Sequence, residues 1–420
     1  MCIRDRILCV ALPLGATAHA SQEANSFADD PVNPLTEVET VRIAMARPAV
    51  SGLIEGQLAL AESGLTAARI WPNPELQYAR ETVDRSYGDN TEDAIWISQR
   101  FQISGARSLR KDAARVRLDG AQFGARGDRL AMQADARQLF HRLLHQHRAV
   151  MAVEHWATRM SRMTAVVEKR QQAGEVSGYD ALRLSRERAT VNAALNREQS
   201  TRARLWAAMG ALLGSPDVAG RFDGIAGDLL PGAPPNLARL LASLTDRPDL
   251  AELEREVAAL DLERRASARG WVPDVTLGVG QKEVTDDLGR DSGPMVSAGI
   301  TLPLFDRGQA DVQRASAQAE IARSRHQLLL QQAQGEVTGL WRELSGLRSA
   351  ALEARRGADE EVSDMIRIAE AAYEGGELGV LELLDAYRSA YLAEVQALEL
   401  AAAARLASIE LDLLTGGAVE

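Results

Sequence analysis

Hydrophobic and small residues recur every seventh position along much of the first half of the chain. From Gly105 onward, large apolar and small residues form two parallel series: Leu109, Val116, Phe123 and Leu130, and Ala113, Gly120, Gly127 and Ala134. This pattern is typical of closely packed coiled helices. It predicts one helix from Gly105 to about Gln172, roughly 100 Å long at 1.5 Å per residue. A glycine turn, "AGEVSG", follows, and a second helix is predicted from Asp180 to about Leu213.

Four shorter segments alternate between apolar and polar residues with a period of two, which predicts strands. They are residues 75–83 and 94–103, and residues 274–283 and 295–304. The loops between them, "DRSYGDNTED" and "TDDLGRDSGP", are acidic and are expected to be solvated. Each segment has about the 9 to 11 residues that a tilted membrane strand needs. One side of these segments is apolar: Ile95, Ile97, Phe101 and Ile103, then Val275, Leu277 and Val279, then Val296, Ala298, Ile300, Leu302 and Leu304.

The second half of the chain echoes the first in the same order. Arg47-Pro48 returns as Arg247-Pro248, and Trp71 returns as Trp271, each 200 positions later. We therefore predict two structural repeats, residues 35–213 and 237–416, joined by a Pro/Gly-rich linker at 214–236. Each repeat is expected to begin with a single amphipathic helix, residues 36–69 and 237–269, which ends at a Trp-Pro phrase. The second repeat is expected to form the same unbroken long helix, turning at "EGGELG".

The first 20 residues are predicted to be a secretory signal peptide, with arginines before an apolar run and a small-x-small cleavage site. Residues 21–34 form an N-terminal extension and residues 417–420 a C-terminal tail. Both cysteines lie in the leader, so no disulfide or thiolate site is expected after cleavage. The formal charge of -11 argues against nucleic acid as a partner.

No enzyme signature is visible, and neither a cofactor nor a metal site is expected. A nucleophile elbow, a phosphate loop and a dinucleotide fingerprint are all absent from the sequence. In "HRLLHQH", His141 and His145 lie one helical turn apart, a spacing that suits a metal ion. Because no acid or cysteine completes the set, we interpret this stretch as a solvated helix face.

Beyond the leader, no window approaches the roughly 20 apolar residues of a membrane helix. The mature chain is therefore either soluble or a membrane protein built from weakly marked strands. Four strands cannot close a barrel, for which about eight is the minimum. A membrane-spanning chain of this kind must share its sheet with other chains.

The sequence resembles the TolC-like outer-membrane efflux family over residues 35–416. The features that carry the resemblance are the duplication, the strand pair in each half, "WPNPELQ", and the glycine-then-acidic helical turns. The phrases "PNPEL" and "ISQRFQISGAR" most resemble the CzcC-like cobalt-zinc-cadmium branch. The resemblance implies a mainly α fold with a small β part, in which three chains build a twelve-stranded outer-membrane barrel continued by a periplasmic α-helical tunnel. It also implies a homotrimer that contacts outer-membrane lipid, a periplasmic adaptor and an inner-membrane pump of the RND type.

The same resemblance assigns roles at the tunnel tip, within "YEGGELGVLELLDA". It places Glu382 and Asp385 in inward-facing rings of acids, which would attract cations. It pairs Tyr373 with Asp180 as a latch of the closed tip, whereas the family's latch arginine is replaced here by Leu378. It assigns adaptor docking to the two turns, at Gly174, Glu175 and Val176 and at Gly376, Glu377 and Leu378.

Several of these residues also have simpler explanations. Glu382 and Asp385 are acids near the start of a helix, where its dipole favours them. Glycines at turns end helices. Trp71, Trp96 and Trp271 suit membrane interfaces, but they also suit packing at junctions between helices and strands.

The function predicted from the sequence is a passive export channel, with heavy-metal cations as the first candidate cargo. A drug-efflux or type I secretion channel is an alternative with the same architecture. An exported coiled-coil scaffold without a pore and an exported hydrolase are alternatives of other classes. Four alternating segments of membrane length disfavour the scaffold, and the lack of a nucleophile-base set disfavours the hydrolase.

Overall fold

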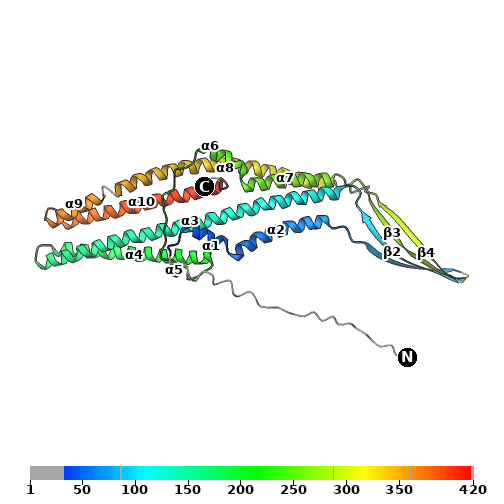
Figure 1. The fold of residues 1–420 in the computed structure, drawn as a ribbon, viewed down its shortest axis with the longest axis horizontal. Coiled ribbons are helices and arrows are strands. Elements are labelled where there is room, and N and C mark those ends of the chain that lie inside the picture. Colours follow the sequence, from blue (N-terminus) through cyan, green and yellow to red (C-terminus); the bar gives the residue numbers. More distant parts are fainter. Residues whose placement is uncertain (1–32, 86–87, 287, 359–361, 418–420) are drawn as a thin grey trace, which may run out of the picture.

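The computed structural model describes residues 33–85, 88–286, 288–358 and 362–417. The predicted signal peptide, nearly all of the N-terminal extension and most of the C-terminal tail lie outside these residues. The described part is a long, narrow molecule with helical hairpins at one end and a sheet at the other (Figure 1). It is mainly helical with one small antiparallel sheet, as the sequence predicts.

The longest element is α3, Ala106–Gln172, and it confirms the predicted unbroken helix. It starts after Gly105, whose φ of 69° suits a residue without a side chain. Its 67 residues carry the chain about 100 Å. The chain then turns back into α4, Gly178–Leu213, which runs beside α3 (Figure 1). Gly214 in the left-handed region ends α4, as expected of a helix C-terminus.

The long helix of the second half is described in two parts, and residues 359–361 between them lie outside the described residues, so the second unbroken helix stays a prediction. The structure has α8, Gln309–Arg356, followed by α9, Val362–Glu374, and α10, Val380–Leu414. At Gly357 the α8 helix passes into a π turn. Nothing packs where a Cβ of Gly357 would lie. Glycine weakens a helix, which is consistent with a local departure from regular α-helix geometry at this residue.

Each predicted leading helix is split, so the prediction of a single helix at the start of each repeat is wrong. The first becomes α1, Glu37–Met45, and α2, Pro48–Arg69. The second becomes α6, Leu237–Ser243, a short 3-10 turn at Leu244–Asp246, and α7, Pro248–Ser267. In both halves the break falls at the repeated Arg-Pro phrase, because proline fits the first turn of a helix but not its interior.

The four strands form one antiparallel sheet in the order β1-β2-β3-β4. They are β1, Glu75–Arg85, β2, Gly88–Phe101, β3, Asp274–Asp286, and β4, Gly289–Thr301. The central pairing of β2 with β3 joins the two halves of the chain. Within the described residues, β1 and β4 each have one neighbouring strand and form the two edges of the sheet.

The two acidic segments that we expected to be loops are largely strand. Residues 88–93 extend β2 and residues 289–294 extend β4. Acids in these segments lie opposite bases on neighbouring strands: Arg80 NH2 lies 2.8 Å from Asp93 Oδ2, and Lys282 Nζ lies 2.5 Å from Glu92 Oε2. Opposite charges across a ladder stabilise it, so acidic residues do not end these strands.

The predicted linker, residues 214–236, contains the short helix α5, Val218–Arg221, and crosses between the two halves (Figure 1). Helical side chains donate to its backbone carbonyls: Arg148 to Gly227, Arg405 to Asp228 and Leu230, Arg348 to Pro231, and Trp341 to Pro235. Leu229 of the linker is buried together with Phe140 and Leu144 of α3. The linker is thus an integral part of the middle of the molecule.

A buried cluster of charges joins the N-terminal helix α1 to α3 and α10. Glu37 lies 2.5 Å from Arg137 and 2.8 Å from His141 Nε2, and Arg137 lies 3.1 Å from Asp412. His141 is only 2% exposed, so our interpretation of "HRLLHQH" as a solvated helix face is wrong. The reason is a partner about 100 residues upstream. No group of three or more potential metal ligands occurs among the described residues.

This cluster predicts an acid-sensitive contribution to stability. Burial would raise the pKa of Glu37, but hydrogen bonds from His141 and Arg137 outweigh it and lower that pKa from 4.5 to about 2. A lowered pKa stabilises the fold fully above about pH 4.5, and this contribution, at most about 3 kcal/mol, is lost as the pH falls towards 2. We expect Glu37→Gln to lower the melting temperature in detergent at pH 7 and to lose less on acidification to pH 3 than the wild type. An unchanged pH dependence in the variant would contradict this role.

None of the helices in the described part of the chain is apolar and long enough to cross a membrane.

Candidate functional site

The sheet has one apolar face, and the pairing of the strands assembles it. Ile97 lies opposite Leu76 on β1 and opposite Val279 on β3, and Val279 in turn lies opposite Val296 on β4. Residues paired across an antiparallel sheet share a face. The apolar side chains on this face are exposed, and they include Leu76, Tyr78, Ile95, Ile97, Phe101, Leu277, Val279, Val296 and Ile300. A row of this size exposed to water marks an interaction surface.

The opposite face carries small and polar residues. Ser98 on β2 lies opposite Gly278 on β3, which in turn lies opposite Ser297 on β4. In the same way Arg100 lies opposite Thr276, which lies opposite Gly299. Along β3 and β4 the residues of this face are less exposed than those of the apolar face. The sheet thus has the alternation of a wall with lipid on one side and water on the other.

The three tryptophans proposed as interface anchors occupy different positions. Trp71 and Trp271 follow α2 and α7 directly, at the junction between helices and sheet, and are 52% and 65% exposed. The ring of Trp71 lies edge-on to Phe101 and beneath the guanidinium of Arg107. Trp96 lies between Ile95 and Ile97 in β2, so it belongs to the polar face. The structure therefore groups Trp71 with the apolar face and separates Trp96 from it.

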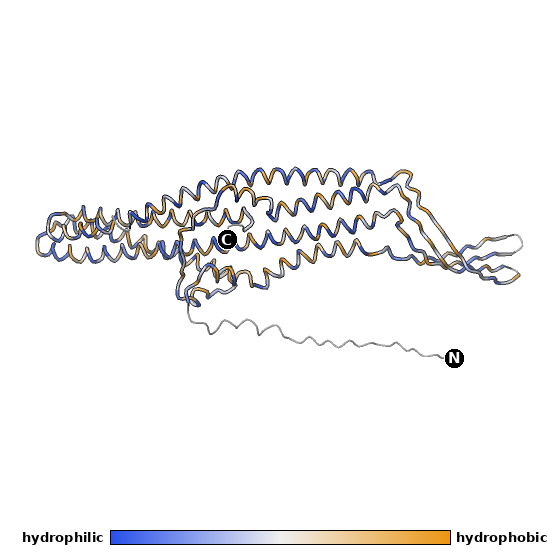
Figure 2. Tube along the Cα trace, turned by 45° about the horizontal axis from the view of Figure 1, so that its top comes forward, coloured by the Kyte–Doolittle hydropathy of each residue, from blue (hydrophilic) through white to orange (hydrophobic). Residues whose placement is uncertain are grey.

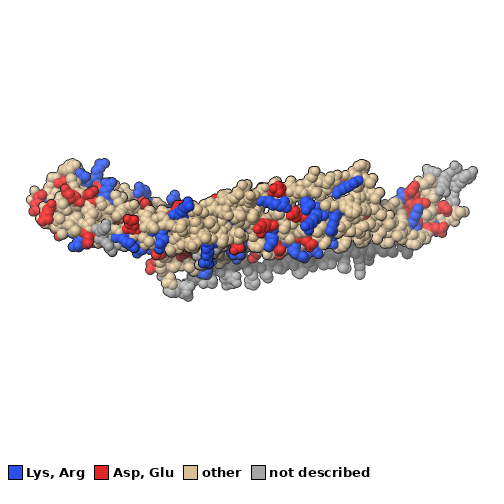
Figure 3. All heavy atoms as spheres, turned by 90° about the horizontal axis from the view of Figure 1, so that it is seen from above, with Lys and Arg blue, Asp and Glu red and all other residues tan. Residues whose placement is uncertain are grey.

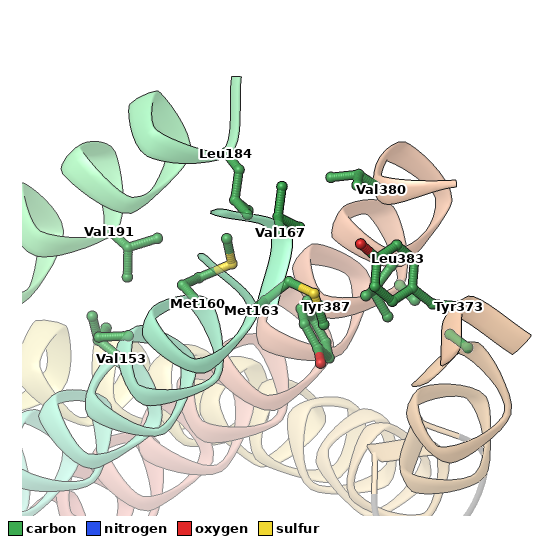
Figure 4. Close-up of a cluster of buried hydrophobic side chains, with 13 residues drawn as sticks. Val153, Met160, Met163, Val167, Leu184, Val191, Tyr373, Val380, Leu383 and Tyr387 are labelled. Carbon is green, nitrogen blue, oxygen red and sulfur yellow. The ribbon is translucent and has the colours of Figure 1, made fainter. Parts of the chain in front are cut away.

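At the other end of the molecule, two helical hairpins pack against each other through a shared buried cluster (Figure 4). α3 and α4 supply Met160, Met163, Val167 and Leu184, and the second hairpin supplies Tyr373, Val380, Leu383 and Tyr387. Tyr387 donates to Glu370 Oε1 at 2.7 Å. Burial, and then this bond to Glu370, raise the pKa of Tyr387 above its usual range.

Glu382 and Asp385 lie at the start of α10 and are both exposed. Their neighbours Leu383 and Ala386 are buried in the cluster, so the two acids share the outer face of the helix. Acidic side chains are also visible at this end of the molecule in Figure 3. A spacing of three residues places the two carboxylates about one turn apart on a helix, which is the arrangement that two stacked rings require.

The predicted Tyr373–Asp180 latch is not formed within one chain. Asp180 accepts a hydrogen bond from Ser177 Oγ at 2.7 Å, and Ser177 caps the start of α4. Tyr373 is 3% exposed, and its hydroxyl has no hydrogen-bond partner among the described residues. An unpaired buried hydroxyl costs free energy, so the tyrosine is held by its ring.

Arg170, which the sequence analysis did not single out, links the two hairpins at their tips. From the last turn of α3 it donates to the carbonyl oxygens of Tyr373 and Glu374, both at 3.3 Å. Its guanidinium also lies 5.0 Å from the centre of the Tyr373 ring. A cation at the end of α9 gives the Glu374 carbonyl a donor, adds a second donor to the Tyr373 carbonyl beside Gly376 N–H, and is favoured by the helix dipole. The available signal was a basic last turn in α3, but its target lies more than 200 residues away.

The two tip turns have the same backbone conformation. Gly174 and Gly376 have φ values of 78° and 77°, which favour glycine. Glu175 and Glu377 donate their backbone N–H to Arg170 O and Ala372 O, closing the helix ends as in a Schellman motif. Val176 and Leu378 pack against the buried cluster, while both glutamates are exposed. Leu378 therefore acts as an apolar contact where the family resemblance expects an arginine.

Comparison with known proteins gives consistent matches in sequence and in structure. The family model "Outer membrane efflux protein" matches residues 241–417. The cobalt-zinc-cadmium resistance protein CzcC of Cupriavidus metallidurans is 26% identical over 93% of this chain and 92% of its own length. The nickel-cobalt-cadmium resistance protein NccC of Alcaligenes xylosoxydans xylosoxydans is 25% identical over 73% of this chain and 78% of its own length.

Two solved structures share the fold at lower identity. The outer membrane protein VceC of Vibrio cholerae has a TM-score of 0.75 at 19% identity and covers 91% of this chain and 97% of that one. CusC, described as forming a transmembrane channel, has a TM-score of 0.74 at 16% identity. The match covers 91% of this chain and 92% of CusC. The family model matches the second half of the chain, and the match to CzcC extends the likeness over most of the first half.

The matched family has a well-defined general role. Its members are channels and not enzymes. They are outer-membrane proteins with a periplasmic helical tunnel, and this chain shares that localisation. Channels of the family are trimeric and work with periplasmic adaptors and inner-membrane pumps.

Proposed function

We propose that this efflux protein is the outer-membrane channel of a tripartite system that exports heavy-metal cations. It acts as a passive duct for cargo that an inner-membrane pump of the RND type delivers through a periplasmic adaptor. The observation that carries the proposal is a four-stranded sheet with an exposed apolar face and two edge strands. Such a sheet is incomplete as a wall, because edge strands leave backbone groups unpaired in lipid.

Three copies supply the missing strands. If β4 of one chain pairs with β1 of the next, three chains give twelve strands, enough to close a barrel. The apolar face then meets lipid, and the small polar face lines the passage. Trp71 and Trp271, at the helix end of the sheet, are placed to anchor this barrel at the membrane interface. The two repeats, residues 35–213 and 237–416, would then alternate around the trimer.

Relatives support metal cations as cargo. CzcC and NccC carry metal resistance in their names and match 93% and 73% of this chain. OprJ of Pseudomonas aeruginosa and the pyoverdine export protein OpmQ of Pseudomonas putida match at similar identity, and the name of OpmQ makes a siderophore a competing cargo beside the drugs proposed from the sequence. Metal cations are favoured because the match to CzcC spans 92% of that protein, against 65% for OprJ.

The exposed acids of α10 fit a cation-selective constriction. In a trimer, Glu382 and Asp385 would form two rings of three carboxylates at the tip of the tunnel. Rings of like charge attract cations and bind multivalent ions most strongly. The tip turns beside them, with exposed Glu175 and Glu377, are the proposed docking points of the adaptor.

Arg170 supplies a closing contact in place of the absent arginine at position 378. It holds the second hairpin through two carbonyl oxygens and the Tyr373 ring. The Tyr373–Asp180 pair is retained only as a contact between neighbouring chains, where it would provide the missing partner of the Tyr373 hydroxyl.

A resistance assay tests the proposed cargo. The channel is expressed with its own adaptor and pump in a Gram-negative host that lacks metal and drug efflux channels. We expect growth at several-fold higher zinc, cobalt or cadmium, and no change in tolerance of antibiotics. If the channel raises tolerance of antibiotics and not of metals, the cargo is drugs and the proposal of metal cations is wrong.

A further inference from the structure

The polar face of the sheet carries one large aromatic residue among the described strand positions, Trp96. Its neighbours across the ladder are Gln77 on β1 and Gly280 on β3. A Cβ on Gly280 would lie 2.4 Å from Trp96 Cβ and 2.2 Å from the carbonyl oxygen of Ile95. No other residue type fits at 280 without moving the backbone. The indole therefore stands beside one position on β3 that has no side chain, with Met295 beyond it on β4.

Several other positions near Trp96 on this face have small side chains or none. Gly278 and Ser297 lie opposite each other on β3 and β4, and a Cβ on Gly278 would lie 2.4 Å from Ser297 Oγ. Gly299 follows on the same face. The half-buried Trp96 is thus the large aromatic surface on this face, which also carries the long side chains of Arg100, Lys282 and Met295.

Both faces of the sheet carry more acids than bases. On the apolar face, Arg80 is paired with Asp93 and Arg290 with Glu283, and the register places Asp84 and Asp89 on that face as well. On the polar face, Arg100 and Lys282 are paired with Asp274 and Glu92. The register adds one further base to the polar face, Arg85, and four further acids: Glu75, Glu81, Asp286 and Asp291. The face that carries Trp96 is therefore acidic, and it attracts cations.

We propose that Trp96 lines the passage through the sheet and forms a contact site for cations, with organic ammonium ions as the ligand class it binds best. The proposal rests on the proposed trimeric channel, in which three indoles face one passage. The π-face of an indole attracts cations, and quaternary ammonium groups suit it because they lose little hydration. This role differs from an anchor in lipid, which the position of Trp96 on the polar face does not allow.

Cysteine accessibility tests where the side chain lies. Both native cysteines, Cys2 and Cys9, precede the described residues and fall within the predicted leader. We therefore compare wild type, Trp96→Cys, Ile97→Cys and Ser297→Cys, a half-buried position on the same face as Trp96, as open channels in planar bilayers. A membrane-impermeant trimethylammonium thiol reagent is expected to reduce the current of Trp96→Cys and Ser297→Cys, and to leave Ile97→Cys and wild type unchanged. Modification of Ile97→Cys in place of Trp96→Cys would overturn the assignment.

Block by tetraethylammonium tests the contact with cations. We expect Trp96→Ala to need about fivefold more blocker for half-block, a loss of roughly 1 kcal/mol, as for a solvated cation–π contact. Trp96→Phe should retain most of the block, and Trp71→Phe should behave as wild type. Equal block in Trp96→Ala and wild type would overturn the binding site. A wild-type protein that forms trimers but conducts no current would instead contradict the proposed function.

Discussion

Replacing Glu382 and Asp385 together with alanine is expected to raise the divalent-cation concentration for half-block of the channel about tenfold, or 1.4 kcal/mol. In a trimer this change removes six carboxylates from the narrow end of the tunnel. Both side chains lie on the exposed face of α10, while Leu383 and Ala386 hold the helix in place from the buried face. The fold is therefore expected to survive the substitution. The measurement is single-channel current as cobalt, nickel or zinc is titrated on the tip side.

Glu394→Ala is the matched control, because this acid is exposed on the same helix three turns further from the tip. It should change the half-block concentration little, since charges beyond about 10 Å are screened at moderate salt. A half-block concentration that is the same in the double variant and in wild type would exclude both acids from the constriction. Single variants would then show whether either ring acts alone.

Replacing Arg170 with alanine is expected to loosen the closed tip. The substitution removes two charge-assisted hydrogen bonds to α9 and the contact with the Tyr373 ring. A loss of about 2 kcal/mol from the closed arrangement corresponds to roughly thirty-fold more opening. We expect a higher resting conductance in bilayers and greater entry of large antibiotics, such as vancomycin, into cells that carry the variant.

Lys169→Ala provides the control for Arg170, because it removes the same charge from the neighbouring residue, whose side chain is exposed. It should leave the resting conductance unchanged. Arg170→Lys should restore closure only in part, because an ammonium cannot reach two carbonyl oxygens with a rigid fork. If Arg170→Ala conducts like wild type, the tip must be closed by contacts between chains.

The regular parts of the fold were predictable because their pattern is local and long. The seven-residue series from Leu109 to Leu130 was enough to predict α3, since dozens of consecutive positions follow one rule. The strands were found for the same reason, and the echo of Trp71 in Trp271 gave the order of elements in the second half. What failed was the reading of charged positions near the hairpins, because the partner of an acid such as Asp93 lies on another strand.

The candidate site was only partly predictable, for a related reason. Glu382 and Asp385 were found through a motif, and the structure adds that both are exposed on one face of α10. The role of Arg170 depends on a helix end in the other hairpin, and the burial of His141 depends on Glu37. Trp96 was proposed as an anchor from its residue type alone, whereas its face depends on alternation with Ile95 and Ile97. Contacts between distant segments are not visible in a local pattern.

Planar-bilayer recording of the purified full-length protein is the most direct test of the channel itself. The protein is extracted in detergent, its trimer fraction is isolated, and it is added to one side of a lipid bilayer. The proposed trimer with a shared sheet predicts uniform current steps that persist over minutes and prefer cations to anions. Trimers that insert into the bilayer and never give a current step would contradict it.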